Sequence, residues 1–287
     1  MLAVVLLLLV LALVLILSLR VREVPPAPDP YEGMVQVSNG AGGLMWIAPL
    51  EELEVADFLS DDFYPDGAFV NYSGSEFVVL RGIDVSEHQL EIDWASVRED
   101  GVDFAIIRAG YRGYSAGTLN EDAFFRRNIE EAITNGIQVG IYFFSQAVSP
   151  AEAREEARYL LGLIEGYQID LPVFYDWEPV AGVGETRTEN VTGEELTEFA
   201  IAFCEAIETG GFEAGVYFYR SLGYFEYQLD RLSDFEFWAA APGAYPDFYY
   251  THGFWQYSFT ARVKGIEVDT DLDIRFVRIP PAEEAAE

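Results

Sequence analysis

Two carboxylates follow a short apolar run near the middle of the chain. The segment LPVFYDWEPV places Leu171 to Tyr175 before Asp176 and Glu178, with Trp177 between the two acids. If the run is a β-strand, side chains alternate at period two, so both acids point to one side with Cα atoms ~6.6 to 6.8 Å apart. Carboxyl groups that share a cleft repel each other, and with partial desolvation this raises one pKa enough to make a general acid. The spacing therefore indicates a general acid, and the competing interpretation is an ordinary pair of acids on a loop.

Further acids stand at the ends of the first and last strands that the sequence predicts. Asp84 closes the strand in GIDVSEHQ, and Asp271 opens the one in TDLDIRF. The first and last strands of a closed barrel are neighbours, so four carboxylates are expected at one mouth. Such a cluster costs stability, and that cost usually marks a site. Aromatic and amide side chains on other predicted strands suit sugar rings, and the predicted substrate-binding residues are Tyr142, Phe144, Tyr217, Tyr219, Trp255 and Gln256.

Strand and helix patterns alternate from residue 81 onward. Five strand–helix units, with helix N-caps expected at Asn120, Ser149 and Thr192, indicate parallel strands. Three more strand-like runs, FEFWAAA, GFWQYS and DLDIRF, follow with little helix between them. We therefore predict an α/β fold, an irregular (β/α) barrel over residues 81–279. Its strands are buried on both faces, and polar function gathers at their carboxyl ends.

The N-terminal nineteen residues carry no charged side chain, which predicts a transmembrane helix or a signal segment. The run ends in RVREV without an A-x-A cleavage pattern, which favours an uncleaved anchor. Arg20 and Arg22 would by the positive-inside rule draw the rest of the chain into the cytoplasm. Around the barrel we expect an anchor at 1–19, a proline-rich spacer at 20–33, a small β-rich or irregular segment at 34–80 that begins with two strands around an N-G turn, and an acidic tail at 280–287.

Composition excludes several function classes. The 287 residues include 49 acids and 17 bases, and a formal net charge of −32 repels nucleic acid and anionic membrane surfaces. The single cysteine, Cys204, excludes internal disulfides and multi-cysteine metal sites. There is no H-E-x-x-H motif and no P-loop, so we expect no cofactor and no metal. A metal-dependent polysaccharide deacetylase using Asp84 and His88 is a weak alternative.

Taken together and in order, GIDVSEHQ with IDW, FAIIRAG, NGIQVGIYFFS, EAREEARYL, DWE, WQYS and TDLD resemble the glycoside hydrolase family 25 muramidases, the Chalaropsis-type lysozymes. The resemblance runs from about Arg81 to Phe276. It implies cleavage of the β-1,4 bond between N-acetylmuramic acid and N-acetylglucosamine in peptidoglycan glycan strands. On this resemblance Glu178 is the catalytic acid, Asp176 its partner, and Asp84 and Asp271 are two further acids of the cleft.

The chain departs from the family pattern at two turns. The glycine common after HQ is Leu90 here, and the glycine usual after WQYS is replaced around Thr260 and Ala261. The rival hypothesis is a catalytically inactive wall-binding or scaffold protein on the same barrel, and retention of all four acids argues against it. For the mechanism we favour assistance by the substrate's 2-acetamido group, with a carboxylate nucleophile left open. A wall-cleaving function also predicts a single-pass protein of the cell membrane with an extracytoplasmic catalytic domain. This is the opposite of the orientation that Arg20 and Arg22 predict by the positive-inside rule.

Overall fold

The computed structural model describes residues 1–18, 29–180 and 182–280. Most of the predicted spacer at 20–33 and nearly all of the predicted tail at 280–287 therefore lie outside the described residues. The part that positions the acids is a barrel that begins a few residues earlier than expected, at Phe77 instead of 81.

Eight strands of the described residues close into this barrel. Strand β5 pairs with both β6 and β13, so the sheet has no free edge at that point. Neighbouring strands run parallel from β5 through β12, and β13 is antiparallel to both β12 and β5. In chain order the strands are β5 (Phe77–Val85), β6 (Phe104–Arg112), β8 (Gln138–Ser145), β9 (Val173–Trp177), β10 (Ala214–Tyr219), β11 (Glu236–Ala240), β12 (Phe254–Ala261) and β13 (Thr270–Arg278).

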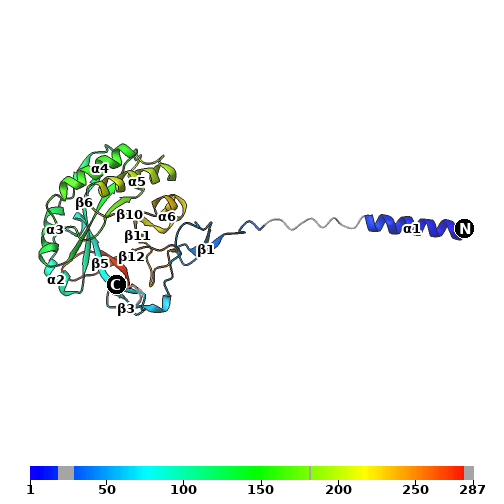
Figure 1. Ribbon diagram of the computed structural model, residues 1–287, viewed down its shortest axis with the longest axis horizontal. Helices are drawn as coiled ribbons and strands as arrows, with labels where there is room; N and C mark the ends of the chain where they lie inside the picture. Colours follow the sequence, from blue (N-terminus) through cyan, green and yellow to red (C-terminus); the bar gives the residue numbers. More distant parts are fainter. Residues whose placement is uncertain (19–28, 181, 281–287) are drawn as a thin grey trace.

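Helices connect the first six of these strands and lie outside the barrel (Figure 1). The last two connections, β11 to β12 and β12 to β13, contain no helix in the described residues. The predicted irregular barrel with five βα units and three further strands is thus confirmed. The helices are α2 (Trp94–Glu99), α3 (Phe125–Thr134), α4 (Pro150–Leu163), α5 (Gly193–Thr209) and α6 (Arg220–Phe225), with single 3₁₀ turns η2 (Glu87–Gln89) and η3 (Leu229–Leu232).

Two of the three expected N-caps are confirmed. Ser149 accepts from the Glu152 amide at the start of α4, and Thr192 forms a capping box with Glu195 on α5. The third is wrong. Asn120 belongs to the short strand β7 (Leu119–Glu121), which folds back antiparallel on β6, so helix α3 begins five residues later at Phe125.

Strand β9 shows how the barrel divides its side chains. Phe174 belongs to the apolar cluster that fills the barrel interior, together with Trp238. Tyr175 and Trp177 point the other way, into the larger core between strands and helices. The alternation therefore carries Asp176, two residues after Phe174, to the inner face directly above the apolar filling.

The segment before the barrel packs on its outer side. It contains η1 (Ser60–Asp62) and two antiparallel hairpins, β1 (Val35–Ser38) with β2 (Leu44–Ile47) and β3 (Phe63–Asp66) with β4 (Phe69–Tyr72). Phe58 and Phe63 pack against Phe276 of β13 with ring centroids 4.4 and 6.2 Å away, and Val55 forms a β-bridge with Tyr250. These contacts fix the segment to β13 and to the residues that lead into β12.

Helix α1 (Leu2–Ser18) has 17 residues, fewer than the span predicted at 1–19. Among the helices of the described residues, none has both the length and the apolar character needed to cross a membrane.

Candidate active site

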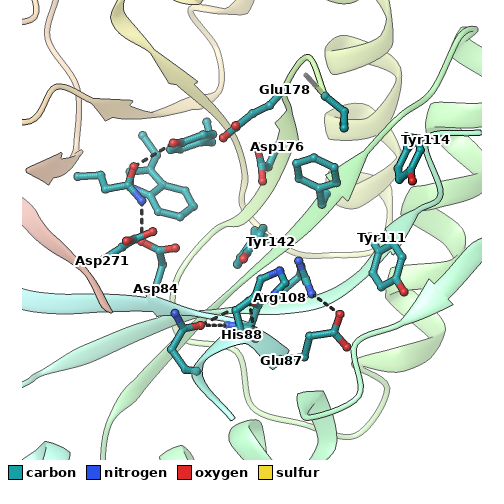
Figure 2. A pocket seen from close by; sticks show the side chains of 17 residues that line it. Asp84, Glu87, His88, Arg108, Tyr111, Tyr114, Tyr142, Asp176, Glu178 and Asp271 are labelled. Atoms are coloured by element: carbon teal, nitrogen blue, oxygen red, sulfur yellow. Dashed lines mark hydrogen bonds and ion pairs between the residues drawn. The ribbon is translucent and has the colours of Figure 1, made fainter. Parts of the chain in front are cut away.

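The four predicted acids meet at one mouth of the barrel (Figure 2). Asp84 ends strand β5, Asp176 lies near the end of β9, and Glu178 follows that strand. Asp271 stands at the start of β13, and because that strand is antiparallel its first residues reach the same mouth, with Asp271 directly opposite Asp84. All four side chains line a cavity of about 470 Å³.

Burial shapes the acid pair on β9. Asp176 is 6% exposed, and desolvation, then repulsion by Glu178, raises its pKa well above the ordinary value, while Arg108 acts in the opposite direction. Desolvation also raises the pKa of Glu178, and the nearby Tyr217 hydroxyl partly counteracts it. Because the two groups titrate together, the pair holds a proton at a pH where free carboxyl groups have lost theirs. That proton is available for general acid catalysis.

The second acid pair joins the first and last strands. Desolvation, followed by repulsion from Asp271 and Asp273, raises the pKa of Asp84 well above its ordinary value. Desolvation and the charge of Glu178 raise the pKa of Asp271 to about 6. The two pairs therefore influence each other's ionisation across the cavity.

Asp84 is held by a chain of hydrogen bonds across three strands. The Tyr217 hydroxyl on β10 donates to Oε1 of Gln256 on β12 at 2.9 Å. The Gln256 amide then donates from Nε2 to Asp84 Oδ2 at 2.7 Å. Since the amide oxygen accepts and the amide nitrogen donates, Gln256 presents a donor to the carboxylate, which opposes the rise in its pKa.

Of the predicted substrate-binding residues, one does not line a cavity. Tyr142, Phe144, Tyr217 and Gln256 line the cavity of the acids, and Tyr219 lines a neighbouring one with Tyr217. Trp255 is fully buried in the outer core, where its Nε1 donates to the Ala241 carbonyl at 2.8 Å. The reason is strand alternation: Gln256 faces inward, so its neighbour on β12 faces outward.

Several cavity residues were not predicted from the sequence. Arg108 on β6 pairs with Asp122 at 2.8 Å and with Glu87 at 3.2 Å, and it supplies the positive charge beside Asp176. Its position in FAIIRAG, inside an apolar strand, was the available signal, since a buried arginine needs partners. His88, named above only for the weak deacetylase alternative, also lines the cavity. The other lining residues missed are Ser86, Glu87, Gln89, Tyr111, Tyr114, Val180 and Trp238.

Asp273 is a fifth acid, behind the cavity. It is fully buried on β13, where it accepts from Trp238 Nε1 at 2.8 Å. Desolvation raises its pKa to about 8, against the favourable bond from Trp238 and a hydrogen bond with Asp84. The D-L-D spacing could have revealed it, because Asp271 and Asp273 share one strand face.

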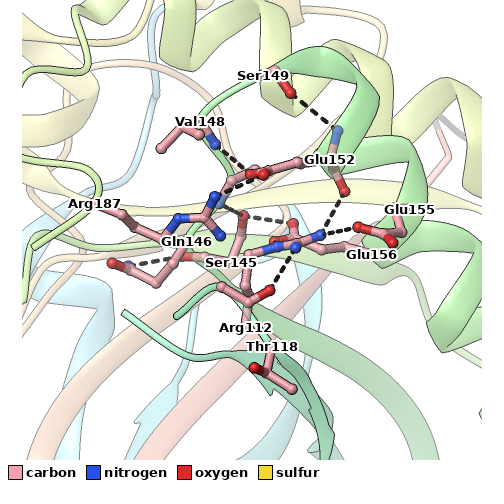
Figure 3. A network of polar contacts seen from close by, with 12 residues as sticks. Arg112, Thr118, Ser145, Gln146, Val148, Ser149, Glu152, Glu155, Glu156 and Arg187 are labelled. Carbon is pink, nitrogen blue, oxygen red and sulfur yellow. Dashed lines mark hydrogen bonds and ion pairs between the residues drawn. The ribbon is translucent and has the colours of Figure 1, made fainter. Parts of the chain in front are cut away.

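A polar network lies behind the segment that carries Glu178. Figure 3 shows Gln146, Glu152 and Arg187 of this network. Gln146, after β8, donates from Nε2 to the Glu178 carbonyl at 2.8 Å, and Thr188 donates to Gln146 Oε1 at 3.1 Å. Arg187 in the same loop pairs with Glu152 on α4 at 2.6 Å. The segment that carries the acid is therefore fixed to the neighbouring strand and helix.

The same network ends in a buried ion pair. Glu156 on α4 accepts from Arg112 Nε and from Ser145 Oγ, each at 2.6 Å. Burial raises the pKa of Glu156 to about 7, although both donors oppose the shift. Arg112 also pairs with Glu155 at 2.8 Å, so its charge balances two carboxylates of one helix.

The cavity combines a proton-holding acid pair with aromatic rings and hydrogen-bonding groups. In the part of the chain that the structure describes, no group of three or more His, Cys, Asp or Glu side chains is arranged to hold a metal ion. The chemistry that these side chains can perform themselves is hydrolysis assisted by a carboxylic acid.

Comparison with known proteins points to one family. Residues 83–266 match the family described as glycosyl hydrolases family 25. The chain is 24% identical over 195 residues to an autolytic lysozyme of Clostridium acetobutylicum and 29% identical over 207 residues to lysozyme M1 of Streptomyces globisporus. These matches cover 68% and 67% of this chain but 55% and 66% of the relatives' lengths.

Solved structures share the fold. A bacterial lysozyme of Streptomyces coelicolor superposes with a TM-score of 0.55 at 25% identity, covering 71% of this chain and 94% of that one. The modular autolysin LytC of Streptococcus pneumoniae, solved with a synthetic peptidoglycan ligand, gives a TM-score of 0.58 at 24% identity, covering 72% of this chain and 53% of that one.

The buried carboxyl of Asp273 predicts an unusual dependence of stability on pH. A raised pKa means that the folded state favours the protonated form, so its stabilisation is complete below about 3.8 and is lost as pH rises through about 8. Asp273→Asn can still accept from Trp238 and cannot ionise. Its melting temperature should exceed that of the wild type by roughly 2–8 °C at pH 8.5 and differ little at pH 4, by thermal denaturation.

The matched control is Asp269→Asn, which alters an exposed acid just before β13 and should shift neither value by more than about 1–2 °C. An equal gain for Asp273→Asn at both pH values would contradict the ionisation argument.

Proposed function

The chain belongs to glycosyl hydrolases family 25, and from that premise we propose that it is a peptidoglycan hydrolase, a lysozyme of the N-acetylmuramidase type. The scissile bond is the β-1,4 linkage between N-acetylmuramic acid and N-acetylglucosamine. The observation that carries the proposal is the buried pair Asp176 and Glu178 on one strand face, with pKa values raised by burial, in a cavity shared with Asp84 and Asp271.

Glu178 is the proton donor to the leaving oxygen. It is the more exposed member of the pair and lines both the cavity of the acids and the neighbouring one, so a glycosidic oxygen can reach it from the open cleft. Desolvation keeps its proton on at mildly acidic pH. The Thr188 hydroxyl donates to the side-chain oxygen of Gln146 and orients its amide. The Gln146 amide in turn donates to the Glu178 carbonyl and holds the backbone of Glu178 in place.

Asp176 orients the substrate's 2-acetamido group. Its Oδ1 is buried and has no hydrogen-bond partner among the described residues. An unpaired buried carboxylate oxygen is costly, and the N–H of an acetamido group is a donor that would satisfy it. The acetamido oxygen then attacks the anomeric carbon as the bond to the leaving oxygen breaks and Glu178 gives up its proton.

The remaining cavity residues bind the sugar rings and stabilise the charge that develops on them. Tyr142, Phe144 and Tyr217 offer aromatic faces to the C–H faces of sugar rings, and Gln256 fixes Asp84. Asp84 and Asp271 add carboxyl groups to the cavity, and in their ionised form these stabilise the positive charge that develops on the sugar in an oxocarbenium-like transition state.

We further propose a location at the cell membrane, with the catalytic domain extracytoplasmic. This proposal rests on the charge-free stretch at residues 1–19 and on the extracellular position of the wall. This orientation is opposite to the one that the positive-inside rule predicts from the two arginines after the stretch. We give the arginines less weight because large domains translocate largely regardless of such charge.

The proposed activity predicts the chemical nature of the new chain ends. Incubation of the protein with purified peptidoglycan should release fragments whose reducing ends are N-acetylmuramic acid. Reduction with borohydride followed by acid hydrolysis and chromatography should then yield muramicitol and no glucosaminitol. Glucosaminitol would contradict the bond assignment, and binding to the wall without new ends would favour the inactive scaffold.

Substitutions within the acid pair should separate the two roles. Glu178→Gln should lower kcat/KM on peptidoglycan by about 10²–10⁴, yet much less on an aryl glycoside whose leaving group needs little protonation. Asp176→Asn should impair both substrates to a similar degree, because the attacking group is needed in each case. The comparison is made from kcat/KM of both variants on both substrates. If Asp176→Asn is the variant rescued by the aryl leaving group, the roles are reversed.

The proposed location predicts accessibility from outside. Protease added to intact protoplasts should remove the barrel domain, detected with an antibody against it, while a cytoplasmic marker protein stays intact. Protection of the barrel until the membrane is lysed would contradict the outward orientation.

A further inference from the structure

A second cavity continues the cleft of the acids. It has a volume of about 660 Å³ and shares Glu178, Tyr217 and Asp271 with the first. Its far wall is formed by the turn of the β1–β2 hairpin, residues 39–41, and by Met45. This hairpin precedes residue 83, where the family match begins, so the wall lies outside the matched part of the chain.

The hairpin is built to stay in this position. Val37 and Ile47 are buried and belong to the main core. At the turn, Asn39 Oδ1 accepts from the amides of Ala41 and Gly43, each at 2.9 Å. The turn is therefore an ordered surface of the cleft.

Gly40 is the point at which the turn meets the barrel. Its φ of +73° favours glycine, and a Cβ there would lie 2.6 Å from Nη1 of Arg220. Arg220, at the start of α6, is 8% exposed and lines the same cavity. The guanidinium thus sits between the barrel and the hairpin turn.

Two of the three guanidinium nitrogens are occupied. Nε donates to Asp247 at 2.8 Å, and Nη2 donates to Asp247 and, at 3.1 Å, to the Pro242 carbonyl. Nη1 makes no hydrogen bond among the described residues. Asp247 therefore fixes the plane of the guanidinium and leaves Nη1 as a donor for a ligand in the cavity.

The rest of the lining defines the ligand. Among the residues that line this cavity Arg220 is the basic one, in a chain of net charge −32, while Tyr219 and Phe259 offer aromatic faces and Ser221 a hydroxyl. An arginine with a free N–H prefers a carboxylate, and aromatic faces suit a sugar ring. The carboxyl groups of Glu178 and Asp271 lie at the edge shared with the first cavity, so the positive charge available to an anionic ligand is at the Arg220 end.

We propose that this second cavity is an additional glycan subsite, in which Arg220 binds a carboxylate carried by a muramic acid unit beyond the two sugars that flank the cleaved bond, with the β1–β2 turn as its outer wall. The inference rests on the proposed muramidase function. In peptidoglycan that carboxylate belongs either to the lactyl ether of a muramic acid without its peptide or to the stem peptide attached there.

The test compares soluble peptidoglycan fragments whose carboxylates are free with the same fragments converted to primary amides. For the full-length wild type, amidation should lower kcat/KM about tenfold, chiefly through KM, because a charge-assisted hydrogen bond is lost. In Arg220→Gln this ratio should fall to about 1–2. Ala41→Asp, an exposed position in the turn that leaves the Arg220–Asp247 pair intact, should reduce the ratio by charge repulsion, whereas Ala41→Lys should keep or increase it.

Arg231→Gln serves as the matched control, since this arginine lies in η3 and pairs with the exposed Glu198 outside both cavities. Its rates and ratio should equal those of the wild type, and melting curves check that every variant is folded. A wild type indifferent to amidation overturns the inference, as does an unchanged ratio in both Arg220→Gln and Ala41→Asp.

Calorimetric binding of the same two fragments separates the subsite from catalysis. If the protein binds the free carboxylate form more tightly but forms no product, the subsite is supported and the muramidase proposal is refuted. If it forms product but binds both forms equally, the muramidase proposal is supported and the subsite is refuted. Fragments with and without stem peptides identify the source of the carboxylate: preference retained after the stems are removed assigns it to the lactyl group, and preference confined to stem-bearing fragments assigns it to the peptide.

Discussion

The structure depends on burying carboxylates at the mouth of a closed barrel. Strand β5 pairs with both β6 and β13, and this closure sets Asp84 opposite Asp271. Apolar filling led by Phe174 and Trp238 seals the barrel beneath them, so water cannot reach the acids from below. Desolvation is accordingly the first cause of every raised pKa in the cluster. The same burial that costs folding free energy supplies the proton that the chemistry needs.

What the sequence could predict follows from periodicity. Alternation at period two placed Asp176 and Glu178 on one side, and chain order in a barrel brought Asp84 and Asp271 together. The same rule, applied to WQYS, would have removed Trp255, because Gln256 and Trp255 cannot both face inward. Aromatic character alone was the reason for including Trp255, and it does not distinguish the inside of a barrel from the core around it. Asn120 failed for a related reason, since a good N-cap residue is also common in the turns and edges of hairpins.

Tertiary contacts between distant segments lay beyond local patterns. The N-G turn before Gly43 was legible as a turn, but its use as a cleft wall depends on the approach of Gly40 to Arg220, 180 residues later. Leu90 is an intermediate case. Its φ of 58° makes it the one non-glycine residue with positive φ in the described ranges, at a position where the resemblance expects glycine. A leucine there stores backbone strain beside the Ser86–Gln89 turn that lines the cavity, and the Ser86–Gln89 capping box holds it in place.

Two different structural elements flank the acids, a buried polar network behind Glu178 and the β1–β2 hairpin in front. Behind Glu178, Gln146 and the Arg112–Glu156 pair belong to a buried network that fixes the position of this residue at the cost of desolvating an ion pair. In front, the hairpin adds surface without adding charge to the acids, since its turn contributes glycine, alanine and asparagine. A further acid at the rim would add to the repulsion that already contributes to the raised pKa values of Asp84, Asp176 and Asp271. Small neutral residues, with one arginine held by Asp247, are therefore a composition that extends the cleft and leaves the proton balance of the acid pair unchanged.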